Sequence, residues 1–267
     1  MINIVLLAPI HNSLYARLVA FRLTKEKDVK LSGIVVRSHW NLRRIRSEFN
    51  RDGARLIKKV FNKLVVGDQR FSGMETNNLV SLARKWHLPY KSLKEIALYL
   101  NIPYSIVPDH NHPKSLKFLQ GIKPDVILFT GGGLLRKPVL EIPRLGILNC
   151  HTGILPQYRG MDVVEWTAVE EKINSVGFGA SLHFMDNKVD TGPVLLKRAI
   201  APKPGTTFEN IRADLETIMV ELMIEGVRGL QAGILAPQPQ DPVAGRQYYV
   251  MHPRIKSSAE SRLLKQI

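Results

Sequence analysis

The stretch "KPDVILFTGGGLLRKPVLEIPRLGILNCHTGILPQYRG", residues 123–160, contains two apolar runs that each end in a turn-forming or polar segment. The first run, Val126–Phe129, has no polar residue, as is typical of a strand that is covered on both faces. The second run ends on Asn149 and His151, which lie one residue apart where the strand meets a loop. In open parallel sheets ligands bind beyond the carboxyl ends of the strands, so this position is a candidate site.

The same alternation of strand and helix signals extends towards the N-terminus. Short runs rich in β-branched residues at 2–8 and 31–37 enclose a segment, Leu14–Leu23, with helical periodicity. This order predicts a β-α-β unit, and strands separated by helices favour an open, largely parallel sheet. We therefore expect an α/β fold of Rossmann-like type with helices on both faces of the sheet.

Two segments depart from this plan. About 60 residues at 38–100 separate the second and third predicted strands, whereas loops in such folds usually have 2 to 6 residues, so we expect a helical, basic insertion there. Farther on, Thr206 and Glu209 form a capping-box signature that begins a long helix. The predicted organisation is a core domain at 1–205, which contains the insertion, and a C-terminal helix with a short extension at 206–267.

Composition limits the class of protein. The chain has 38 Lys and Arg residues against 23 Asp and Glu residues, a formal charge of +15, which would attract an anionic substrate, a nucleic acid or a membrane surface. No apolar run approaches the roughly 20 residues of a membrane-spanning helix, and the N-terminus has no basic leader, so we expect a cytoplasmic protein. The single cysteine, Cys150, has no partner for an internal disulfide, which fits a reducing compartment.

Three polar residues carry the candidate chemistry. Asn149 and His151 alternate with Cys150, so they share one face of the strand while the cysteine points away. An amide donates a hydrogen bond to a developing oxyanion, and an imidazole exchanges a proton near neutral pH. Asp190, in the later segment "MDNKVDTGPV" (185–194), would favour the protonated histidine. This set suits acyl transfer without a side-chain nucleophile, although spacing alone equally allows these residues to satisfy backbone groups and cap a turn.

Two segments, "NCHTGILPQYRG" (149–160) and "GASLHFMDNKVDTGPVLLKR" (179–198), closely resemble the folate-dependent formyltransferase family. That family includes glycinamide ribonucleotide, methionyl-tRNA and sugar-nucleotide N-formyltransferases. Its pattern is Asn-x-His-x-Ser-Leu-Leu-Pro-x-x-x-Gly, followed later by Asp-x-Gly or Asp-Thr-Gly. The positions that match are Asn149, His151, Leu155, Pro156 and Gly160, with Asp190, Thr191 and Gly192. Gly153 stands where the family usually has Ser, which bears on the substrate more than on the chemistry.

The resemblance implies transfer of a formyl group from N10-formyltetrahydrofolate to a primary amine. Asn149 would donate to the oxyanion, His151 would stabilise the same charge and carry a proton, and Asp190 would tune the histidine. The backbone of Gly131, Gly132, Gly133, Leu134 and Leu135 would line the folate pocket. No metal is expected, because His110 and His112 lack further ligands in the sequence and are predicted to be solvated loop residues.

The acceptor amine is expected to be a small, anionic molecule. Methionyl-tRNA formyltransferases have a substantial C-terminal β-barrel domain, and glycinamide ribonucleotide enzymes lack an insertion like 38–100, so both acceptors are less favoured. A nucleotide-linked amino sugar is expected by elimination. The alternatives are hydrolysis of the same folate, or a non-catalytic protein that binds nucleic acid or a membrane through its basic insertion. Self-association of the chain also stays open.

Overall fold

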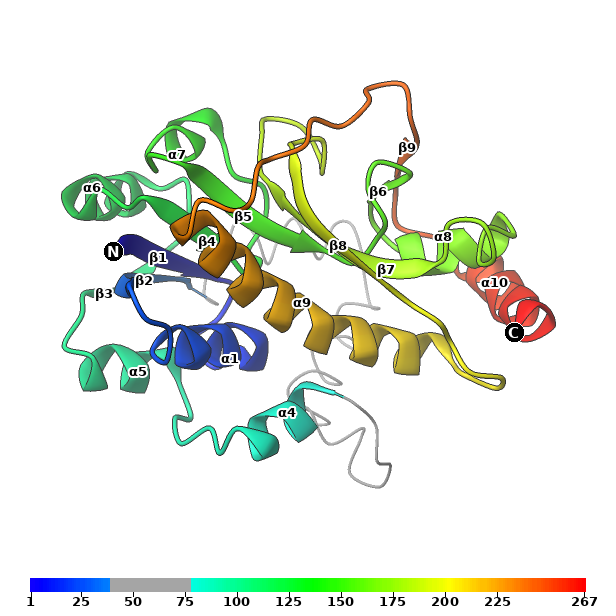
Figure 1. Cartoon of the computed structure of the whole chain (residues 1–267), viewed down its shortest axis with the longest axis horizontal. Helices are drawn as coiled ribbons and strands as arrows, with labels where there is room; N and C mark the ends of the chain where they lie inside the picture. The colour runs from blue at the N-terminus through cyan, green and yellow to red at the C-terminus, as the bar shows by residue number, and fades with distance from the viewer. Residues whose placement is uncertain (39–77) are drawn as a thin grey trace.

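The structure, a computed structural model, describes residues 1–38 and 78–267. Its main feature is a seven-stranded sheet in the order β3-β2-β1-β4-β5-β7-β8 (Figure 1). Strands β1 to β5 run parallel to one another, whereas β7 is antiparallel to β5 and β8 is antiparallel to β7. The strands of this sheet are β1 (Ile2–Ala8), β2 (Val29–Arg37), β3 (Tyr104–Val107), β4 (Val126–Phe129), β5 (Gly146–His151), β7 (Phe178–Phe184) and β8 (Val194–Ile200). The predicted α/β fold with an open, largely parallel sheet is confirmed.

Helices cover both faces of the sheet because its central strands are apolar on both sides. In β1, Ile4 and Leu6 belong to one buried cluster with residues of α1 and α9, while Val5 and Leu7 belong to another with residues of α6 and α7. All of β4 is buried, as its uninterrupted apolar run predicts. Figure 1 shows α1 and α9 on the opposite side of the sheet from α6 and α7. These helices are α1 (Leu14–Leu23), α6 (Pro113–Ile122), α7 (Lys137–Leu140) and α9 (Phe208–Gln231).

The long helix α9 begins one residue later than the sequence signature predicts. The N-cap is Thr207, whose side chain forms a capping box with Asn210. The expected pair, Thr206 with Glu209, is wrong because the Thr206 hydroxyl donates instead to the carbonyl of Lys203. From this cap α9 runs along the sheet and contacts β5, β7 and β8.

The segment after α9 forms two further elements. A short strand, β9 (Arg246–Tyr248), pairs in parallel with the short strand β6 (Tyr158–Gly160) and not with the main sheet. The last residues make a helix, α10 (Pro253–Gln266), which packs against α8 (Val163–Val169). The C-terminal segment therefore returns to the region where β5 ends.

Only part of the predicted insertion at 38–100 can be compared, because residues 39–77 lie outside the described residues. The remainder includes α4 (Leu79–Lys85) and α5 (Leu93–Tyr99), and both helices contact α1. Helical structure is thus present in the described portion of the insertion.

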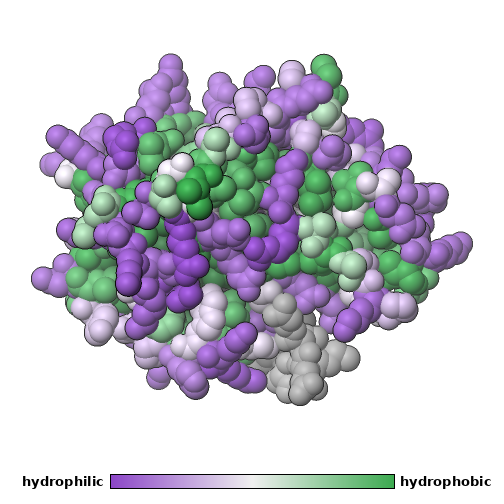
Figure 2. All heavy atoms as spheres, in the orientation of Figure 1, coloured by the Kyte–Doolittle hydropathy of each residue, from purple (hydrophilic) through white to green (hydrophobic). Residues whose placement is uncertain are grey.

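One face of the molecule has a mixed surface. Figure 2 shows polar and charged side chains over most of one face, with apolar side chains between them. Within residues 1–38 and 78–267, no helix has the length and apolar character needed to cross a membrane.

Candidate active site

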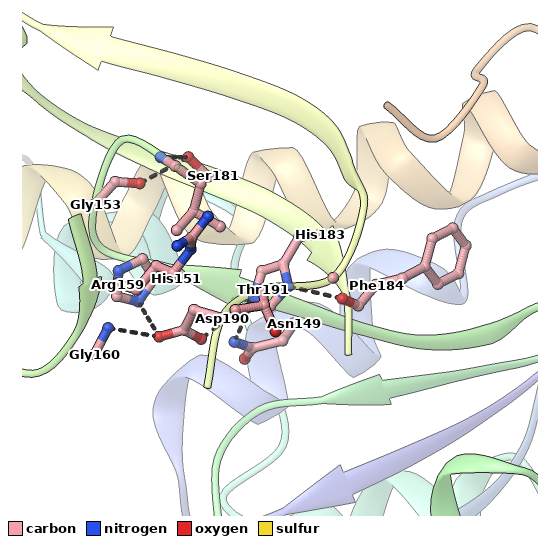
Figure 3. A network of polar contacts seen from close by, with 12 residues as sticks. Asn149, His151, Gly153, Arg159, Gly160, Ser181, His183, Phe184, Asp190 and Thr191 are labelled. Carbon is pink, nitrogen blue, oxygen red and sulfur yellow. Dashed lines mark hydrogen bonds and ion pairs between the residues drawn. The ribbon is translucent and has the colours of Figure 1, made fainter. Parts of the chain in front are cut away.

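The carboxyl end of β5 brings Asn149 and His151 to the place where the parallel part of the sheet meets its antiparallel part (Figure 3). Pairing with β4 sets Phe129 beside Asn149, and pairing with β7 sets His183 opposite Asn149. The His151 residue is 7% exposed. Cys150, between the two polar residues, is buried in the apolar core, as the alternation predicts.

Asp190 reaches this pair from the connection between β7 and β8. One carboxylate oxygen, Oδ2, lies 3.4 Å from His151 Nδ1, and the other, Oδ1, lies 3.5 Å from His183 Nε2. The backbone N–H of Gly160 donates to Oδ2 at 2.9 Å. Asp190 has a φ of +54°, in the left-handed region that non-glycine residues enter at a cost. The fold therefore brings Asn149, His151 and Asp190 into one cluster.

Burial and neighbouring groups set the charges of this cluster. Burial would raise the pKa of Asp190, but the imidazoles of His183 and His151 and the N–H of Gly160 together lower this pKa to about 2. The pKa of His151 is lowered, because burial outweighs the opposing effect of the Asp190 charge and the Tyr158 carbonyl. Near neutral pH the resting site therefore pairs an ionised carboxylate with a neutral imidazole.

The second ring nitrogen of His151 is engaged as well. Its Nε2 lies 2.8 Å from the backbone carbonyl of Tyr158, to which it donates when it carries the proton. A Cβ at Gly153 would lie 2.7 Å from this Nε2 and 2.8 Å from the Tyr158 oxygen. Glycine at position 153 thus makes room for the contact between the imidazole and Tyr158. For Nε2 to reach a substrate, the ring has to leave this carbonyl.

His183 is a member of the cluster that the sequence analysis missed. It is 1% exposed, and its Nε2 lies 3.1 Å from the Asn149 amide nitrogen, while Nδ1 lies 2.8 Å from the Phe184 carbonyl. The signal available in the sequence is a histidine inside the largely apolar strand "GASLHF" (179–184). Its partner, Asn149, could not be inferred, because the pairing depends on the register of β5 and β7.

Asp186 has a different place from Asp190. Its carboxylate accepts from the Thr191 hydroxyl at 2.7 and 2.8 Å and from the backbone N–H of Lys188 at 3.0 Å. These contacts close the turn between β7 and β8, so Asp186 has a structural place in the turn and not a place in the cluster.

The glycine-rich segment follows β4 and lies at the same edge of the sheet as Asn149. The three glycines at 131–133 have φ values of +112°, +130° and +100°, which side chains rarely adopt. A Cβ at Gly132 would lie 2.5 Å from Nε2 of His110. The absence of side chains at 131–133 therefore lets His110 pack closely against this segment, and it also leaves the backbone accessible to a ligand.

The two leucines after these glycines have different environments. Leu134 is 74% exposed, whereas the Leu135 side chain is buried in the second core cluster. Asn111 fixes this segment, since its amide donates to the Leu134 carbonyl at 2.9 Å and accepts from the N–H of Arg136 at 2.7 Å. Of the residues expected to line a folate pocket, Leu135 can therefore contribute only its backbone.

His110 is buried beneath the glycines, so the prediction of a solvated loop residue is wrong. It is 1% exposed, and burial together with the Arg37 charge lowers its pKa to about 4. Arg37 lies against the same segment and donates to the Gly132 carbonyl. Across the described ranges, no group of three or more His, Cys, Asp or Glu side chains is arranged to hold a metal ion.

Comparison with known proteins identifies related sequences. A model of the formyl transferase family matches residues 80–227, more than half of the 267 residues. The methionyl-tRNA formyltransferase of Thermodesulfovibrio yellowstonii is 31% identical over 156 residues, which cover 58% of this chain and 49% of that protein. The methionyl-tRNA formyltransferase of Sorangium cellulosum is 36% identical over 150 residues, which cover 56% of this chain and 47% of that protein. The chain spans about half the length of these curated relatives.

Two solved structures share the fold. Glycinamide ribonucleotide transformylase 1 from Symbiobacterium toebii has a TM-score of 0.58 at 17% identity, over 90% of this chain and 95% of that chain. A sugar N-formyltransferase from Shewanella sp FDAARGOS_354 has a TM-score of 0.57 at 11% identity, over 98% of this chain and 87% of that chain. At these identities the similarity is one of fold.

Proposed function

The chain belongs to the formyl transferase family, and on this premise we propose that it transfers a formyl group from N10-formyltetrahydrofolate to a primary amine. The observation that carries the proposal is the meeting of Asn149, His151 and Asp190 at one edge of the sheet. All three lie within the matched residues 80–227. An amide donor, an imidazole and an ionised carboxylate in one cluster suit formyl transfer to an amine, because the amide stabilises an oxyanion and the other two groups handle a proton.

The segment at 131–134 suits the folate donor. Backbone without side chains at 131–133, beside the 74% exposed Leu134, offers polar groups and an apolar surface to a flat heterocycle with hydrogen-bonding edges. When bound, the donor supplies a carbonyl carbon that an amine attacks, while negative charge develops on the formyl oxygen.

Each side chain of the cluster then has a role. The Asn149 amide faces His183 with one N–H, and its second N–H is available to the developing negative charge. His151 takes a proton from the attacking amine and delivers it to the folate nitrogen, as the bond from that nitrogen to the formyl carbon breaks and tetrahydrofolate leaves. The ionised Asp190, 3.4 Å from Nδ1, favours the protonated ring. Asp190 acts by stabilising the protonated ring and holding its orientation.

We favour a nucleotide-linked amino sugar as the acceptor. The formal charge of +15 would attract the diphosphate of such a molecule. The fold of the sugar N-formyltransferase from Shewanella is similar over 98% of this chain.

Methionyl-tRNA is a second candidate acceptor, because the curated relatives with 31% and 36% identity are methionyl-tRNA formyltransferases. The positive charge of the chain also suits a nucleic acid. The two candidates differ in salt dependence, since binding to many phosphates weakens steeply with added salt.

The test is the release of tetrahydrofolate from N10-formyltetrahydrofolate with a panel of amines. The panel contains amino-sugar nucleotides, glycinamide ribonucleotide and charged initiator tRNA. Release that requires one amine, with formyl recovered on that amine, supports the proposal and identifies the acceptor. Release without any amine would instead indicate a hydrolase, and binding of the folate without release would indicate a non-catalytic protein.

A further inference from the structure

Gln240 lies in the linker between α9 and β9 and crosses the connection that carries Asp190. Its amide nitrogen, Nε2, donates to the backbone carbonyl of Asp190 at 2.9 Å and to that of Gly192 at 2.7 Å. A side chain from the C-terminal segment thus binds the backbone on both sides of Thr191.

The other end of the Gln240 amide contacts Arg159. The Arg159 Nε donates to Gln240 Oε1 at 3.2 Å, and its Nη2 donates to the Asp241 carbonyl at 3.2 Å. Arg159 is 6% exposed, and no carboxylate in the described ranges forms an ion pair with it. The buried guanidinium therefore directs its hydrogen bonds to the linker.

The orientation of the Gln240 amide follows from its partners. A guanidinium only donates and a backbone carbonyl only accepts, so the oxygen faces Arg159 and the nitrogen faces the two carbonyls. Both N–H groups and the oxygen are used. Neither an aliphatic side chain nor a carboxylate could make the same set of bonds.

These contacts hold both the side chain and the backbone of Asp190. Arg159 precedes Gly160 in β6, and the Gly160 N–H donates to the Asp190 carboxylate at 2.9 Å, while Gln240 binds the Asp190 carbonyl. The segment that contains β6 is also joined to the C-terminal segment by the parallel pairing of β6 with β9. Because Asp190 has a φ of +54°, its conformation depends on such external support.

We propose that Gln240 is a positioning residue that holds the Asp190 connection so that the carboxylate faces His151, which makes the C-terminal linker part of the active site. The inference rests on the proposed function in one respect, since it takes Asp190 and His151 as the pair that handles the proton. The hydrogen bonds themselves do not depend on the reaction.

The kinetic test uses Gln240→Ala and Gln240→Leu, the second of which keeps the bulk and removes the hydrogen bonds. Either variant should lower kcat by roughly ten- to a hundredfold, the scale of a small misplacement of a reacting group, and should change the Kd of the folate little. Gln238→Ala, on the exposed side of the same linker, is the matched control and should stay within about twofold of the parent.

A double-mutant comparison separates positioning from general damage. If Gln240 acts through Asp190, Gln240→Leu should lower kcat by less than about twofold in an Asp190→Asn background. If Gln240→Leu lowered kcat in the Asp190→Asn background by as much as it does in the parent, the proposal would be overturned.

A second readout needs no turnover. The groups that face the His151 ring are Asp190, His183 and the Tyr158 carbonyl, and Asp190 is the one that raises the histidine pKa by its charge. Displacing the carboxylate in Gln240→Leu should therefore lower the His151 pKa measured by NMR titration, whereas Gln238→Ala should not. An unchanged pKa in a folded variant would contradict the inference. If no amine is formylated, the proposed function fails, and the titration still decides the role of Gln240.

Discussion

The side chains of Asn149 and His183 meet at 3.1 Å because the two residues stand directly opposite each other in the antiparallel pair of β5 and β7. The Phe184 carbonyl, 2.8 Å from His183 Nδ1, requires the ring proton on that nitrogen. In the neutral ring His183 Nε2 is then the acceptor and binds one N–H of Asn149, so this contact fixes which end of the Asn149 amide is the nitrogen and leaves its second N–H for the site. His183, which was not predicted from the sequence, thus orients Asn149, which was predicted.

His183→Ala should lower turnover by about tenfold or more, because the Asn149 amide loses its partner and its fixed orientation. In an Asn149→Ala background the same change should have a much smaller effect. Steady-state kinetics of the two single variants and the double variant check this. Equal effects of His183→Ala in both backgrounds would show that His183 does not act through Asn149.

Asn149→Ala and His151→Ala should each leave the protein folded and reduce turnover by at least about a hundredfold, the usual scale for an oxyanion donor or an acid–base group. Circular dichroism and thermal unfolding verify the fold before kinetics are compared. Near-normal turnover in either variant would remove that residue from the mechanism.

Asp190→Asn keeps the shape of the side chain and removes its charge, so the His151 pKa should fall further and turnover should fall strongly. Folate binding should change little, because the lost interaction is with the proton and not with the pterin. Asp186→Asn is the matched comparison, since Asp186 only closes the neighbouring turn. If Asp186→Asn reduced turnover more, or if Asp190→Asn failed only in folate binding, the assignment of the carboxylate would be wrong.

Gly153→Ala should displace the His151 ring, because the new methyl group would lie 2.7 Å from Nε2 and 2.8 Å from the Tyr158 carbonyl. We expect a loss of turnover together with a destabilisation of about 1 to 3 kcal/mol, as for other overpacked sites. Gly121→Ala is the control, since a Cβ there meets nothing within 4 Å. Kinetics and urea unfolding of both variants measure the difference; unchanged turnover in Gly153→Ala would show that the ring has room to move.

His110 should make the stability of the protein depend on pH. Its pKa is about 4 in the folded chain against 6.5 in the unfolded chain, so between these values the unfolded chain binds a proton that the folded chain does not. The stabilisation is complete above pH 6.5 and is lost as the pH falls towards 4, by about 3 kcal/mol in total.

Urea unfolding at pH 7 and pH 4.5 tests this: His110→Gln should reduce the dependence, and the part that remains includes the contribution of His151, whose pKa is also lowered. His87→Gln removes an exposed imidazole and serves as the control. A parent-like pH dependence in His110→Gln would refute the assignment to His110.

Much of the fold follows from local patterns in the sequence. The apolar run of β4, the strand that ends on Asn149 and His151, and the β-α-β opening all appear where hydrophobic periodicity predicts them. Periodicity is reliable here because a strand covered on both faces excludes polar residues along its length. The alternation also predicts that Cys150 lies in the core while Asn149 and His151 point the other way at the carboxyl end of β5.

The tertiary structure decided the partners of these residues. The contact of His183 with Asn149 depends on strand register, and the bonds of Gln240 to the Asp190 connection depend on where the linker returns. The burial of His110 depends on the glycines that pack over it. A local pattern reports which side of an element is apolar, whereas these contacts join segments far apart in the chain, so only the packing of the whole domain determines them.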